Sequence, residues 1–179
     1  MTSESITETN SDDRSRWLAL YVLCAGVLMI VLDATVVNVA LPTIQDDLDF
    51  TNANLAWVVN AYLIAFGGSL LLAGRLGDLI GKRAIFLSGM AIFTGLSLVC
   101  GLAPNQEVLI GARFFQGIGG AMTAAVALGM IVTMFPEPRE QAKAIGVYAL
   151  VASAGGWVGL LAGGRPTQAL RWHWFSFVH

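Results

Sequence analysis

The sequence predicts an all-α, polytopic membrane protein with about five transmembrane helices. Hydrophobic residues make up 56% of its 179 positions and charged residues 12%, against roughly 45–50% and about 25% in soluble domains. Apolar residues run without interruption over five segments, each able to cross a bilayer as a helix. Basic residues cluster in alternate connections between these segments, as the positive-inside rule requires of a multi-pass chain.

The polar N-terminal segment, residues 1–16, is rich in Ser, Thr and Glu, and we expect it to be a disordered cytoplasmic tail. The first expected span, residues 18–41, follows Arg14 and Arg16. A secretory signal peptide also begins with basic residues, but its apolar core has only ~7–15 residues. The first apolar run of this chain is longer, and four further spans follow it. The sequence therefore favours a retained first helix.

The other four expected spans are residues 55–72, 84–103, 108–134 and 144–162. All prolines fall outside the five spans, as helix breakers should; they are Pro42, Pro104, Pro136, Pro138 and Pro166. Residues 17–164 thus form the expected transmembrane region.

The positions of Lys and Arg predict the orientation. Basic residues precede span one and follow spans two and four, and the connections after spans one and three have none; they are Arg14, Arg16, Arg75, Lys82, Arg83, Arg139 and Lys143. The N-terminus and the connections after spans two and four should therefore be cytoplasmic. We expect a multi-pass protein of the cell (plasma) membrane.

One carboxylate lies inside the first span. Counted from residue 18, Asp33 lies about 22 Å along the helix, where an unpaired charge is unfavourable by several kcal/mol or more. Arg113 lies at a similar depth in the fourth span, and Gln116 is three residues further along the same face. An Asp33–Arg113 pair with a hydrogen bond from Gln116 is expected, either with a role in transport or as a structural pair retained for specificity.

Glycines mark two further candidate sites. Gly155, Gly159 and Gly163 recur every fourth residue, which indicates a helix-packing stripe, with or without a specific role in transport. The stretch GRLGDLIGKR, residues 74–83, is expected to be a short cytoplasmic loop in which Asp78 and Lys82 are spaced i, i+4. It is either a positive-inside anchor with a tight turn or a gating element.

Several function classes are not supported. GIGGAM in the fourth span has Met122 at its sixth position and no preceding strand, so it is not a dinucleotide-binding motif. His173 and His179 lack metal-ligand spacing, and no nucleophile, base and orienting group share a plausible site. Cys24 and Cys100 lie at different depths and are interpreted as packing residues. We expect no enzyme activity, cofactor, metal or nucleic-acid partner.

Three motifs together resemble the major facilitator superfamily, in particular its fourteen-helix drug:proton antiporter branch. They are LDATVVNVALP at residues 32–42, GRLGDLIGKR at 74–83 and LIGARFFQGIGGA at 109–121. The resemblance covers about residues 17–164, and it implies helices one to five of a six-helix half. It departs at two positions: Leu160 stands where the branch has proline after glycine, and Leu79 where a basic residue follows the aspartate.

By this resemblance, the residues divide into a proton-coupling and substrate pathway and a cytoplasmic gating loop. The pathway would contain Asp33, with Arg113 tuning its proton exchange, together with Asn38 and Gln116. The gating loop would contain Gly74, Gly77, Asp78, Gly81, Lys82 and Arg83. Movement of a substrate or helix near a buried carboxylate can switch its protonation, because burial favours the neutral form and a nearby arginine the charged one.

Two functions remain open on the sequence. The first is the N-terminal portion of a proton-coupled efflux transporter for drugs or other small organic compounds, whose partner is the missing C-terminal transporter half or a second copy. The second is a small autonomous oligomeric membrane protein that acts as an interaction or regulatory module. Residues 165–179, an aromatic segment, are expected to start an incomplete sixth helix.

Overall fold

Five long helices make up the described part of the chain, and no strand occurs within it. The computed structural model describes residues 3–164, and the side chains of residues 14–51 and 53–158. The helices run up and down in chain order: α1 (Ser3–Asp47), α2 (Asn52–Ile80), α3 (Lys82–Gly101), α4 (Gln106–Met134) and α5 (Pro138–Gly164). The expected all-α class is therefore confirmed.

Local sequence signals fix the helix boundaries. The side chains of Thr51 and Asn105 cap α2 and α4 by accepting hydrogen bonds from the backbone N–H of Asn54 and Val108, at 3.2 and 2.9 Å. Pro138 is the first residue of α5, where its fixed φ is favourable and no N–H is needed. Gly81 alone separates α2 from α3 and has φ 111°, a conformation that favours glycine.

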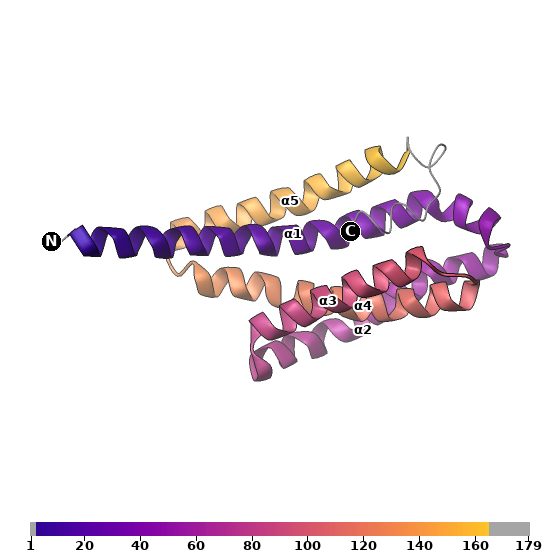
Figure 1. The fold of residues 1–179 in the computed structure, drawn as a ribbon, viewed down its shortest axis with the longest axis horizontal. Coiled ribbons are helices and arrows are strands. Elements are labelled where there is room, and N and C mark those ends of the chain that lie inside the picture. Colours follow the sequence, from indigo (N-terminus) through magenta and orange to yellow (C-terminus); the bar gives the residue numbers. More distant parts are fainter. Residues whose placement is uncertain (1–2, 165–179) are drawn as a thin grey trace.

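The helices pack in two groups. Helix α4 lies against both α2 and α3, while α5 lies along α1 and runs in the same direction (Figure 1). Glycines permit the closest approaches: a Cβ at Gly89 of α3 would lie 2.8 Å from the Gly119 carbonyl oxygen of α4, and one at Gly117 would lie 2.5 Å from the Tyr62 carbonyl oxygen of α2. Helix α4 is thus locked to two neighbours through backbone contact.

Three buried apolar clusters follow one another along the bundle. The first joins α1, α3, α4 and α5 around Phe86 and Ile131. The second joins α1, α2, α3 and α4 with the α1–α2 connection, around Ile44 and Leu109. A small third cluster between α1, α2 and α3 contains Ile30, Tyr62 and Phe93.

Arg16 and Trp17, about a third of the way along α1, attach this helix to the α4–α5 connection. Arg16 Nη1 donates to the Met134 carbonyl at 3.4 Å and lies 3.8 Å from a Glu140 carboxylate oxygen. Trp17 packs edge-on against the buried ring of Phe135, with ring centroids 5.3 Å apart. These contacts, together called the Arg16 anchor, fix α1 to the end of α4 and the start of α5.

Helix α1 extends beyond the expected span at both ends. It begins at Ser3, so residues 3–16, expected to be disordered, are helical; no proline or glycine interrupts them, and an existing helix propagates more easily than a new one nucleates. It also continues through Pro42 to Asp47, although this proline was expected to end the span. Buried Ala40 and Ile44 flank Pro42, and their packing offsets the hydrogen bond that proline removes.

The expected loop at residues 74–83 is almost entirely helical. Helix α2 continues to Ile80 and α3 begins at Lys82, so Asp78 and Lys82 lie on different helices and are not an i, i+4 pair of one continuous helix. The positive φ of Gly81 reverses the chain between them. The expected tail at residues 165–179 lies outside the described residues.

Four helices in the described part, α1 to α4, are long and apolar enough to cross a membrane. Many large apolar side chains on their outer surfaces are exposed, among them Leu63, Leu71 and Trp57 on α2. Exposed apolar surface of this kind is expected of helices in contact with lipid or with other membrane helices.

Candidate functional site: a buried charge cluster

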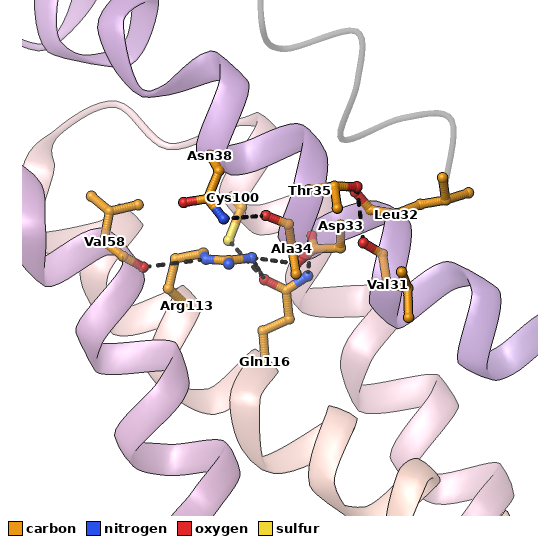
Figure 2. A network of polar contacts seen from close by, with 10 residues as sticks. All are labelled: Val31, Leu32, Asp33, Ala34, Thr35, Asn38, Val58, Cys100, Arg113 and Gln116. Atoms are coloured by element: carbon orange, nitrogen blue, oxygen red, sulfur yellow. Dashed lines mark hydrogen bonds and ion pairs between the residues drawn. The ribbon is translucent and has the colours of Figure 1, made fainter. Parts of the chain in front are cut away.

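An ion pair joins α1 to α4 in the middle of the bundle. Arg113 Nη1 lies 2.6 Å from Asp33 Oδ2. The residues are only 3% and 6% exposed, so water screens this pair little. The two residues are predicted from the sequence to lie at similar depth, and the structure brings their charged atoms together (Figure 2).

Gln116 closes a triangle with the ion pair. Its Oε1 accepts a hydrogen bond from Arg113 Nη1 at 2.7 Å, and its Nε2 donates to Asp33 Oδ1 at 2.9 Å. Both carboxylate oxygens of Asp33 therefore have a donor. Gln116 is fully buried, and the Cys100 thiol on α3 lies 3.7 Å from its Oε1.

Helix α2 holds the other side of the arginine. Arg113 Nε donates to the Val58 carbonyl at 3.4 Å, so the side chain spans from α4 between α2 and α1 (Figure 2). The guanidinium carbon lies 4.5 Å from the ring centroid of Tyr62, within the range of a cation–π contact. Four helices thus contribute to one cluster.

The arrangement is chemically suited to respond to a proton. A buried ion pair is stable only while both charges are present and their hydrogen bonds are made. Protonation of Asp33 would remove the negative charge and leave a buried guanidinium with only neutral partners. No group of three His, Cys, Asp or Glu side chains within the described residues is placed to hold a metal ion.

Asn38, the other candidate on α1, does not join this cluster. It is exposed, and its Nδ2 donates to the Ala34 carbonyl of its own helix at 2.7 Å (Figure 2). Five residues at about 100° each place it some 140° around the helix from Asp33. The structure therefore separates Asn38 from the charge cluster.

The candidate gating residues lie around the α2–α3 turn. Lys82 is half-buried and its Nζ donates to the Gly129 carbonyl of α4 at 3.3 Å. Gly77 is buried, and a Cβ there would lie 2.5 Å from a Val126 methyl. The remaining residues are exposed or half-buried; they are Gly74, Asp78, Gly81 and Arg83. The turn is thus fastened to α4 while its charges stay accessible.

Of the glycine stripe, Gly155 faces α1. A Cβ there would lie 2.8 Å from the Leu28 side chain and 3.3 Å from that of Val31. Gly159 and Gly163 belong to α5, and their contacts lie outside the described residues. The stripe brings α5 close to α1 at Gly155.

Sequence reasoning missed Tyr62, Val58 and the position of Cys100 beside the cluster. A depth count would have found Tyr62, because it lies about 10 Å into its span from Leu55, close to the level of Asp33 and Arg113. The Val58 contact uses a backbone carbonyl, which no side-chain pattern can indicate.

The fold and the site together define a multi-pass helical membrane protein with a buried, hydrogen-bonded ion pair between its helices. Comparison with known proteins agrees. Residues 23–179 match the Major Facilitator Superfamily, and the chain belongs to this family.

Its relatives include proteins named for drug resistance and export. The chain is 47% identical to a puromycin resistance protein of Streptomyces alboniger over 93% of its length. It is 42% identical to a cephamycin export protein of Amycolatopsis lactamdurans over 94%, and 40% identical to a lincomycin resistance protein of Streptomyces lincolnensis over 93%. The matches cover 33%, 35% and 34% of these relatives, so the chain spans about a third of their length.

Proposed function

We propose that this chain forms part of a proton-coupled transporter that exports drugs or other small organic compounds. The observation that supports the proposal is the buried Asp33–Arg113–Gln116 triangle. Intramembrane ionisable residues are rare and usually mark ion or substrate pathways. The names of the relatives supply the substrate class, small antibiotics and drugs.

In the proposed cycle, Asp33 exchanges a proton while α1 and α4 change their contact. With Asp33 charged, the ion pair holds the two helices together. With Asp33 protonated, the attraction falls and α1 is freer to move relative to α4. Binding of a proton and binding of a cationic or polar substrate then compete for the same buried site, which is the linkage that antiport needs.

The proposal includes a topology and a partner. In the cell membrane, the N-terminus and the α2–α3 and α4–α5 connections would be cytoplasmic, because basic residues lie in the helix ends beside these connections, among them Arg75, Arg83 and Arg139. Gly74, Gly77, Asp78, Gly81, Lys82 and Arg83 would form a cytoplasmic gate. A second six-helix half or a second copy would complete the substrate path, since transporters bind substrate between two such units.

The test measures proton-driven ethidium uptake into inverted membrane vesicles. Vesicles carry either this chain alone or a chimera in which residues 17–164 replace the matching part of the Streptomyces alboniger relative. Each is compared with its Asp33→Asn variant and with Asp46→Asn, which changes an exposed aspartate by the same chemistry. We expect uptake by the chimera to collapse with the proton gradient and with Asp33→Asn, but not with Asp46→Asn.

Two results would count against the proposal. If Asp33→Asn chimeras transport as well as the parent chimera, Asp33 is not required for proton coupling. Uptake that persists in the presence of an uncoupler would show that transport is not driven by the proton gradient. Transport by the chain alone would indicate an active oligomer of this chain.

A further inference from the structure

Tyr62 is a buried aromatic residue that faces the charge cluster from α2. The residue is only 4% exposed, and its ring centroid lies 4.5 Å from the Arg113 guanidinium carbon. Phe66, one turn further along α2, stacks on it with ring centroids 5.8 Å apart. On α4, Gly120 leaves room for the Tyr62 hydroxyl, because a Cβ there would lie 3.1 Å from it. The ring is therefore held tightly in one position.

The ring face, and not the hydroxyl, makes the contact with the cluster. Among the described residues, the Tyr62 hydroxyl is buried without a hydrogen-bond partner. The negative face of an aromatic ring attracts a guanidinium, more strongly where water is excluded. Tyr62 thus offers Arg113 a neutral partner that needs no proton and no counter-charge.

The partners of Arg113 fall into two sets. Asp33 on α1 supplies a charge that a proton can remove. The Val58 carbonyl and the Tyr62 ring on α2, with the Gln116 amide on α4, supply neutral contacts that a proton on Asp33 leaves in place. The titratable groups around the guanidinium are Asp33, Tyr62 and Cys100, the last on α3.

We propose that Tyr62 is a positioning residue that holds the Arg113 guanidinium against α2 while Asp33 is neutral. With this contact, the arginine stays buried at the same place in both halves of the proton cycle and is ready to pair again with Asp33. Without it, the neutral state of Asp33 would leave a buried cation poorly compensated. The inference rests on the proposed function for its role in a cycle, but the contact can be tested without transport.

The test is a double-mutant cycle on the full chain in detergent, with thermal unfolding as the measurement. Position 62 carries phenylalanine or 3,4,5-trifluorophenylalanine, since fluorine withdraws electron density from the ring face and leaves the shape almost unchanged. Each is made in the native background and with Asp33→Asn, which imitates the neutral carboxyl. We expect Tyr62→Phe to behave like the native chain. Fluorination should lower the melting temperature by about 2–4 °C more with Asp33→Asn than without it.

Two outcomes would overturn the proposal. Fluorination that lowers both melting temperatures equally would make Tyr62 a packing residue without a link to the charge of Asp33. Fluorination without effect in either background would show that the ring face contributes nothing.

A second measurement applies if Asp33→Asn does not fold. The infrared C=O band of the protonated Asp33 carboxyl is followed against pH in chains that differ only at position 62. Because fluorination disfavours the protonated state, its midpoint should fall by about half to one pH unit, and equal midpoints would overturn the proposal. Loss of transport in the vesicle assay with the expected shifts intact would reject the transport function and leave the Tyr62 contact standing.

Discussion

Arg113 and Asp33, 80 residues apart in the chain, meet at 2.6 Å in the buried centre of the bundle. The pair links α1 to α4, and Gln116 accepts a hydrogen bond from Arg113 and donates one to Asp33. The contribution of the pair to the free energy of unfolding can be measured without a transport assay. A buried charge is costly mainly when its partner is missing, so single and double variants should differ.

Neutralising only Arg113 should destabilise the folded chain more than neutralising both Asp33 and Arg113. Arg113→Met leaves a buried carboxylate without a counter-charge, and we expect it to destabilise the folded chain by about 3–5 kcal/mol at neutral pH. The double variant Asp33→Asn/Arg113→Met should recover most of this loss. Thermal unfolding in detergent measures both, with Asp46→Asn as the exposed control. A double variant that loses the sum of the two single effects would contradict this account of the pair.

The approach of α4 to α2 should depend on the absence of a side chain at Gly117. Gly117→Ala would place a Cβ 2.5 Å from the Tyr62 carbonyl oxygen, and backbone cannot move aside as a flexible side chain can. We expect a loss of about 1–3 kcal/mol in unfolding experiments. Gly111→Ala on the same helix meets nothing within 4 Å and should be neutral or stabilising by up to about 1 kcal/mol. Equal behaviour of the two variants would show that the helices are less closely packed than described.

The α2–α3 turn should depend on the conformation of Gly81. Its φ of 111° is strained for any L side chain, so Gly81→Ala should destabilise the chain by about 1–3 kcal/mol, although nothing lies within 4 Å of an added Cβ. Gly74→Ala, at an open helical position of α2, is the matched control. Unfolding midpoints together with limited proteolysis at the turn provide the measurement. A stable Gly81→Ala variant with an unchanged cleavage pattern would mean that the turn tolerates another backbone conformation.

The helices and the ion pair could be predicted because both follow from the chemistry of the bilayer. Long apolar runs must be helical to satisfy their backbone groups, and a charge at the depth of Asp33 requires a partner at the same depth. The exposed position of Asn38 also follows from the helical period, although its place in the LDATVVNVALP motif drew it into the candidate site.

The remaining features depend on packing that one sequence does not record. Pro42 is a helix breaker by propensity, yet buried Ala40 and Ile44 keep α1 helical around it. The α2–α3 segment is rich in glycine, yet only Gly81 leaves the helical conformation. The role of Tyr62 depends on the path of Arg113 across the bundle, which only the folded arrangement reveals.

Because the Arg16 anchor holds α1 at one point, a tilt of the helix about this point displaces residues in proportion to their distance from it. Arg16, which contacts the α4–α5 connection, and Asp33, which forms the ion pair, are separated by about 26 Å of helix at ~1.5 Å per residue. A tilt of only about 2° around Arg16 would displace Asp33 by roughly 1 Å over this helical length. Directed away from Arg113, this displacement would lengthen the 2.6 Å contact to about 3.6 Å, which is beyond hydrogen-bond distance. Small rotations of α1 about Arg16 therefore produce their larger displacement at Asp33, the buried charge among the described side chains of this helix.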